Sequence, residues 1–233
     1  MKVEDFKEGK VLIIDKPLNW TSFQVVNKIR WAIRKKFNLK KIKVGHAGTL
    51  DPLATGLLVI CTGKMTKKID EFQAEAKEYT GTITLGKTTP SFDLETEIDK
   101  EYPTDHITEK AILETAASFK GISEQKPPLY SAIKKDGVRL YELARKGEQT
   151  EIKSRKIEIF EFEIEKIEFP KVFFRIVCSK GTYIRSIASD FGIKLKSGAH
   201  LSSLRRTKSG NFDLSAAETP ESFVEKLKKE GAN

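Results

Sequence analysis

One aspartate of this chain stands in a constrained segment, which suits a carboxylate that has to be held in a fixed orientation to react. Residues 45–56 read Gly-His-Ala-Gly-Thr-Leu-Asp-Pro-Leu-Ala-Thr-Gly, which places Asp51 between two corners of small residues. Glycine permits positive φ and close approach of the backbone to a ligand, and a proline disposes the residue before it to an extended conformation. The apolar run 57–61 is typical of a buried strand, so Asp51 lies on a constrained loop that leads into the core. Asp-Pro between glycines also forms ordinary turns, and the residue types leave both interpretations open.

The charge of the chain favours an anionic partner. The 233 residues include 42 Lys and Arg against 33 Asp and Glu, a formal net charge of +9. Nucleic acid is the commonest partner of such a surface, although a protein that is merely basic has the same composition. A cluster of cations ends one predicted helix and continues into the next loop, and it fits either a solvated helix end or a contact with phosphate: Arg30, Arg34, Lys35, Lys36, Lys40, Lys41 and Lys43.

The cysteines, histidines and apolar runs argue against a disulfide, a metal site, a signal peptide and a membrane span. Cys61 and Cys178 stand in apolar, strand-like runs, which favours buried free thiols over a disulfide. Three histidines and two distant cysteines show no spacing for a metal site. Residues 1–10 lack the apolar core of a signal peptide, and no apolar run approaches the length of a membrane span. We therefore expect a cytoplasmic protein without a metal or a membrane partner.

Periodicity along the chain predicts an α+β fold, because long strands with period-two patterns are mixed with separate helices. Thr21 and Gln24 have the spacing of a capping box, Thr219 and Pro220 mark a helix start, and a phase slip between Ile159 and Phe160 predicts a β-bulge. The predicted strands are 11–14, 57–61, 79–85, 152–169, 172–178 and 201–212. The predicted helices are 21–36, 67–72, 111–119 with Gly121 as its cap, 139–146, 182–195 and 220–229. Residues 87–107 are predicted to be loop, and the Asp136-Gly137 pair a hairpin turn.

The segment around Asp51 resembles, nearly residue for residue, the signature loop of the TruB family of tRNA pseudouridine synthases. Further matches follow in the order of the family over nearly the whole chain: residues 16–22, 125–132, Gly137, 140–141, 144–147, 178–186, 198–201, 204–207, Gly210 and Phe212. The resemblance implies the pseudouridine synthase fold, with a central, mainly antiparallel mixed β-sheet flanked by helices. It also implies one catalytic domain over 1–233, with an insertion that clamps RNA at about 125–150 and no C-terminal PUA domain.

The resemblance implies isomerisation of uridine 55 in the T loop of tRNA, with Asp51 as the catalytic residue. The uracil is detached, turned and rejoined through carbon, without redox change or hydrolysis, so no cofactor is expected. Cleavage of a glycosidic bond develops positive charge on the sugar, which a carboxylate can stabilise or capture. Whether Asp51 attacks the sugar, attacks the base or removes a ribose proton stays open.

Supporting roles also follow from the resemblance. Arg185 pairs with the aspartate and favours its ionised form. Tyr79 stacks on the flipped base, and Tyr183 and Leu204 line the same pocket. Lys16 and Pro17 support the Asp51 loop.

The expected contacts with RNA involve one histidine, one tyrosine and a set of cations: His46, Tyr130, Lys134, Lys135, Arg139, Arg145, Lys146, Lys180, Arg205 and Arg206. The expected partner is the T stem-loop of tRNA, without a guide RNA, and we expect a monomer. A tRNA-binding folding chaperone without required catalysis is the alternative function. A basic α+β module for another nucleic acid is a third.

Overall fold

The computed structural model describes residues 1–131, 133–135, 137–145 and 152–229, and they form two compact units. Unit 1 comprises residues 1–79 and 204 onward, and unit 2 comprises residues 80–203. The sequence predicted one domain over 1–233. The chain passes between the units inside strands β4 (Lys77–Leu85) and β12 (Ala199–Ser209), so no linker composition marks the boundary.

A mixed sheet forms the centre of unit 1. β1 (Val11–Lys16) runs antiparallel to β3 (Ala54–Thr62), with Lys16 opposite Gly56. The other side of β3 pairs in parallel with β12, where Leu204 lies opposite Ala54 and Arg206 opposite Gly56. Two short strands, β2 (Val44–His46) and β13 (Phe212–Asp213), pair antiparallel with β3 and β12. The predicted mixed, mainly antiparallel sheet is confirmed.

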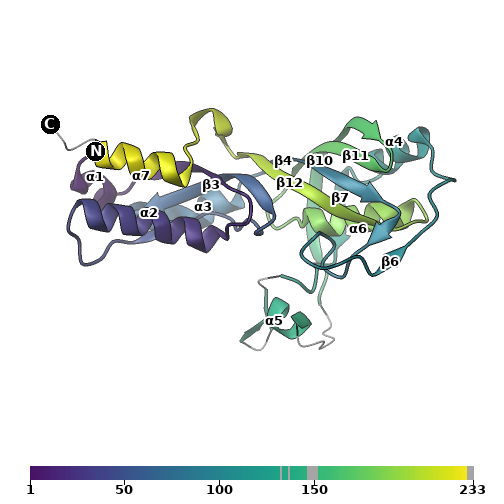
Figure 1. The fold of residues 1–233 in the computed structure, drawn as a ribbon, viewed down its shortest axis with the longest axis horizontal. Helices are drawn as coiled ribbons and strands as arrows, with labels where there is room; N and C mark the ends of the chain where they lie inside the picture. The colour runs from purple at the N-terminus through teal and green to yellow at the C-terminus, as the bar shows by residue number, and fades with distance from the viewer. Residues whose placement is uncertain (132, 136, 146–151, 230–233) are drawn as a thin grey trace. The chain divides into compact units, whose positions relative to one another are not determined.

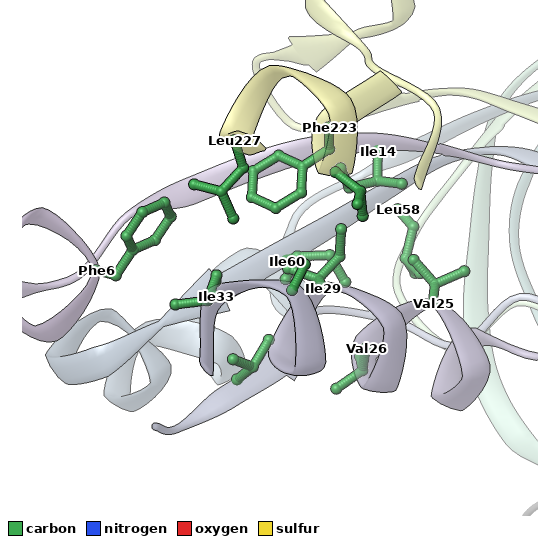
Figure 2. Packing of buried hydrophobic residues seen from close by; sticks show 13 residues of the cluster. Phe6, Ile14, Val25, Val26, Ile29, Ile33, Leu58, Ile60, Phe223 and Leu227 are labelled. Carbon is green, nitrogen blue, oxygen red and sulfur yellow. The ribbon is translucent and has the colours of Figure 1, made fainter. Parts of the chain in front are cut away.

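Two helices cover this sheet and share one apolar core. α2 (Ser22–Lys36) and α7 (Pro220–Lys229) lie side by side (Figure 1). Ile29 and Ile33 of α2 pack with Phe223 of α7 against Leu58 and Ile60 of β3 (Figure 2). Both predicted helix starts are confirmed by side-chain caps: the Thr21 hydroxyl accepts from the Gln24 N–H, and the Thr219 hydroxyl accepts from the Ser222 N–H.

The remaining helices of unit 1 are short. α1 (Val3–Glu8) opens the chain, and the 3-10 helix η1 (Gly63–Lys68) follows β3 and leads into α3 (Ile69–Ala74). A second 3-10 helix, η2 (Leu214–Ala216), precedes α7.

Unit 2 is built on a long hairpin of β10 (Arg155–Glu168) and β11 (Lys171–Cys178), with the predicted bulge between Ile159 and Glu161. β4 pairs with β11, and β7 (Gly121–Gln125) pairs with the outer edge of β10. α4 (Glu109–Ala117) and α6 (Ile184–Lys194) complete the unit, whose core includes the ring contacts of Phe119, Phe162 and Phe191.

Small elements occupy two stretches of unit 2. β5 (Lys87–Thr88) and β6 (Lys100–Glu101) pair within the segment predicted to be loop. In the predicted insertion, β8 (Lys134–Lys135) pairs with β9 (Val138–Arg139) and is followed by α5 (Leu140–Arg145). The prediction that Gly121 caps the preceding helix is wrong. Gly121 is the first residue of β7, because residues 121–125 pair with β10.

Both cysteines are buried free thiols, as predicted. In the part of the chain that the structure describes, no helix combines the length and the apolar character that a membrane span requires.

Candidate active site

The Asp51 loop joins β2 to β3 and is anchored at both ends and to the start of α2. The Ala47 N–H donates to the Val59 carbonyl at 2.9 Å, and the Ala54 N–H donates to the Asp51 carbonyl at 3.1 Å. Gly48 adopts a φ of +97°, which glycine accommodates without steric cost. The buried Ser22 hydroxyl accepts from the Leu50 N–H at 2.9 Å and donates to the Leu50 carbonyl at 3.1 Å. The backbone before Asp51 is therefore held by α2, whose position the core determines.

Lys16 holds the other side of the loop from the end of β1. Its side chain is 0% exposed, and its ammonium donates to the carbonyls of Trp20 at 2.6 Å, Pro17 at 2.9 Å and Pro52 at 3.4 Å. The Asn19 N–H also donates to the Pro52 carbonyl, at 2.9 Å. One buried cation thus joins the segment after β1 to the residue that follows Asp51, which fits the predicted supporting role of Lys16 and Pro17.

Arg206 differs from its prediction as an RNA contact. Its side chain is 1% exposed, and its guanidinium donates to the Leu57 carbonyl at 2.7 Å and to the Gly48 carbonyl at 3.1 Å. A buried guanidinium that binds two backbone carbonyls of the Asp51 loop and β3 cannot reach an RNA surface. Arg206 therefore acts as a brace of the loop.

The approach of Arg206 depends on Gly56. A Cβ on this glycine would lie 2.3 Å from the Arg206 carbonyl oxygen, and its φ of +99° is one that other residues rarely adopt. Glycine at position 56 therefore lets β12 lie against β3 directly after the Asp51 loop.

Charges within unit 1 couple at this site. Burial lowers the pKa of Lys16 to about 8, the negative charge of Asp51 opposes this shift, and the charge of Arg206 adds to it. The coupling is reciprocal, so the ammonium of Lys16 favours the ionised form of Asp51. Burial and the charge of Arg206 also lower the pKa of His46. The ring of His46 is therefore neutral at neutral pH and suits contact with a base better than pairing with a phosphate.

Two further predicted site residues stand where the chain segments of unit 1 meet unit 2 in sequence: Tyr79 ends the first segment and Leu204 begins the second. Leu204 pairs with Ala54, three residues after Asp51, and its side chain is half-buried. Tyr79 is 9% exposed on β4.

Arg185 and Tyr183 belong to unit 2. The buried Arg185 guanidinium lies 3.7 Å from the Asp93 carboxylate and donates to the Ser91 carbonyl at 3.2 Å. The amide of Gln125 fixes the backbone of Tyr183: its Oε1 accepts from the Tyr183 N–H at 2.8 Å, and its Nε2 donates to the Tyr183 carbonyl at 3.1 Å. The pairing of Arg185 with Asp51 stays a prediction.

The predicted RNA contacts have different surroundings. The Arg205 side chain, 40% exposed, forms a bidentate ion pair with Asp15, which neutralises part of its charge. Lys180 is exposed in the turn before α6, and Tyr130 is half-buried. The backbone of the insertion places its cations on β8, β9 and α5, namely Lys134, Lys135, Arg139 and Arg145, and Lys146 lies outside the described residues.

Ser22, Gly56 and Asp93 contribute to these arrangements and were not singled out from the sequence. Ser22 and Gly56 lie inside matched motifs, which is the signal that could have found them. Asp93 stands in a polar stretch without any such signal. Within the described ranges, no group of three or more His, Cys, Asp or Glu residues could hold a metal ion.

Comparison with solved structures defines the class of this fold. The chain superposes on a protein in the crystal structure of a Cbf5-Nop10-Gar1 complex with a TM-score of 0.74 and 31% identity, which covers all of this chain and 60% of that one. A structure of an H/ACA RNP bound to a substrate RNA containing 2′-deoxyuridine gives a TM-score of 0.70 at 28% identity, over 98% of this chain and 57% of that one. The chain therefore spans about three fifths of the length of these structural relatives. The fold is that of the pseudouridine synthases.

Sequence comparison identifies the family. Residues 34–184 match the N-terminal domain of the TruB family pseudouridylate synthases, and residues 185–232 match the tRNA pseudouridylate synthase B C-terminal domain. A protein of Flavobacterium johnsoniae named tRNA pseudouridine synthase B is 61% identical, over 97% of this chain and 100% of its own length. A protein of the same name from Phocaeicola vulgatus is 57% identical, over 96% of this chain and 95% of its own length. The chain belongs to the TruB family, and the resemblance found in its motifs is confirmed.

Proposed function

We propose that this protein converts uridine 55 in the T loop of tRNA to pseudouridine. Membership in the TruB family supports the reaction, and the name of the Flavobacterium johnsoniae relative supports tRNA as the substrate. The observation that carries the proposal is the Asp51 loop, whose backbone is braced by Lys16, Ser22 and Arg206. A backbone held at three places keeps the main chain of a catalytic residue in one position, which supports catalysis by positioning.

Asp51 is the catalytic residue of this proposal. Detachment of uracil develops positive charge on the ribose, and an ionised carboxylate can stabilise or capture that charge. Lys16 and Arg206 are positioning residues, because their polar atoms are engaged with backbone carbonyls. The charge of Lys16 favours the ionised carboxylate, because the two groups are coupled electrostatically.

The base has to leave its stack to reach Asp51. Tyr79, Tyr183 and Leu204 are the residues that would hold the flipped base, by ring stacking and apolar contact. Arg185, held in place by Asp93 and the Ser91 carbonyl, would pair with Asp51.

The T stem-loop would be gripped by the insertion at 125–150 and by His46 and Lys180. The reaction moves a base within one nucleotide, so it requires no redox partner and no cofactor. We propose that the protein acts as a monomer without a guide RNA.

The test is release of tritium from tRNA labelled at carbon 5 of uridine, with the wild-type protein and with Asp51→Asn. We expect release by the wild type only, from one uridine per tRNA, and largely unchanged tRNA binding by Asp51→Asn. Equal losses of binding and turnover would assign Asp51 a structural role. A folded wild type that binds tRNA without any release would contradict the proposal and favour the chaperone.

A further inference from the structure

Five lysines surround one pocket in unit 1, at the opposite end of β3 from the Asp51 loop. The pocket has a volume of about 370 Å³, and its lining includes Lys7, Lys41, Lys43, Lys64 and Lys67. All five side chains are exposed.

Distance separates this pocket from the candidate active site. β3 begins at Ala54, three residues after Asp51, and ends at Thr62, directly before Gly63 in the pocket wall. The first and last residues of this nine-residue strand are eight steps apart, which spans about 26 Å at roughly 3.3 Å per step. The pocket is therefore not part of the Asp51 site.

The pocket is built where three segments meet at Gly63. The Gly63 N–H donates to the Lys43 carbonyl at 2.9 Å, which ties the loop before β2 to the start of η1. A Cβ on Gly63 would lie 2.1 Å from the Lys7 carbonyl oxygen, so the end of α1 packs directly against this glycine. Close backbone contact therefore brings lysines from three separate parts of the chain around one hollow.

The charge of the pocket is largely uncompensated. Lys64 forms an ion pair with Glu8 at 2.7 Å. Across the described part of the chain, Lys7, Lys41, Lys43 and Lys67 have no ion pair, and no acidic residue lines the pocket. Four ammonium groups that form no ion pair with a described residue produce a local positive potential around the hollow, which attracts anions.

We propose that this pocket binds the sugar-phosphate backbone of the tRNA, at a second place distant from the reacting uridine. The lysines are exposed, hydrated point charges on flexible stems, and none of the described residues that line the pocket is an arginine. Such a lining suits a run of backbone phosphates better than one small phosphate held by directed hydrogen bonds. The inference rests on the proposed function, because a tRNA engaged at Asp51 would meet this pocket at a high effective concentration.

The experiment measures tRNA affinity against salt concentration for the triple variant Lys41→Ala, Lys43→Ala, Lys67→Ala. Loss of three phosphate contacts lowers the slope of log affinity against log salt by about two to three, and lowers affinity at least about tenfold at low salt. The triple variant Lys110→Ala, Lys120→Ala, Lys171→Ala removes the same charge from exposed positions of unit 2 and serves as the control. We expect it to keep the wild-type slope.

Turnover separates this inference from the proposed function. We expect an unchanged kcat and a raised KM in the pocket variant, because Asp51 is distant. The proposal would be overturned by an unchanged salt slope in the pocket variant, or by an equal loss of slope and tRNA affinity in the control variant. It would also be overturned if millimolar inorganic phosphate competed with tRNA for the wild type but not for the pocket variant, because the pocket would then be a site for one small phosphate. Absence of tritium release by the wild type would contradict the proposed function and leave the binding comparison interpretable.

Discussion

Substitution of Lys16 by Met separates the stability of the fold from the placement of Asp51. Met has a similar length but no charge, so the change removes the donors to the carbonyls of Trp20, Pro17 and Pro52 and leaves the site filled. It also removes a buried positive charge that is coupled to Asp51.

Two opposing contributions to the free energy of unfolding follow. Burial lowers the pKa of Lys16 from its ordinary value of 10.5 to about 8, and this shift corresponds to a cost of about 3 kcal/mol for the charged form at neutral pH. Met relieves that cost. It also leaves carbonyls at 2.6 and 2.9 Å from the former ammonium without their donor, at about 1–3 kcal/mol each. The two carbonyls together lose about 2–6 kcal/mol, so the contributions largely offset and we expect a net change in stability of no more than about 3 kcal/mol.

Activity is expected to fall much further than stability. Pro52 directly follows Asp51, and a displacement of about 1 Å at a reacting group can reduce turnover about 100-fold. We therefore expect kcat to fall about 100-fold or more, while KM for tRNA stays near the wild-type value. The assays are urea denaturation and single-turnover tritium release at saturating tRNA.

Lys16→Arg is the matched variant, because it keeps a positive charge and donors to the same carbonyls. Partial recovery of kcat by Arg is expected. Full activity of Lys16→Met in a folded protein would refute the reasoning that this cation positions the Asp51 loop.

Three further predictions concern the same unit. Because the charged form of Lys16 positions the loop, we expect activity to fall as pH rises, with a midpoint near pH 8 that is absent in Lys16→Arg. The free energy of unfolding is expected to rise between about pH 8 and 10.5, because the unfolded state binds more protons than the folded state in this range. Gly56→Ala is expected to destabilise the protein far more than Gly121→Ala. Both glycines have a similar positive φ, but only at Gly56 does the backbone of Arg206 occupy the space that a Cβ would need. Comparable losses of stability in urea denaturation would contradict this steric argument. Arg206→Lys should lower Tm and kcat without changing the salt slope of tRNA binding, and a lowered slope would restore Arg206 as an RNA contact.

Local features of the fold were predictable because their causes are local. The capping residues Thr21 and Thr219 bond within their own first helical turn, and the bulge after Ile159 appears as a slip in a period-two pattern. β7 (Gly121–Gln125) was not predicted, because the cause of this strand is not local. The segment has five mostly polar residues, and it forms a strand because it pairs with the edge of β10.

The site divides in the same way. Glycines, Asp51 and Pro52 stand together in the chain, so a single segment indicated a constrained loop with one carboxylate. The sequence could not show which residues brace that loop, because Lys16, Ser22 and Arg206 reach it from three distant segments.

Arg205 and Arg206 separate what can be predicted from the sequence from what depends on the fold. The sequence predicts two adjacent cations on a strand, and adjacent residues of a strand point to opposite faces. Which face is covered depends on the parallel pairing of β12 with β3, whose residues lie about 150 positions earlier in the chain. That pairing turns Arg206 inward onto the Asp51 loop and leaves Arg205 with Asp15 at the surface, because burial of a strand face is a property of its neighbours and not of its own residues.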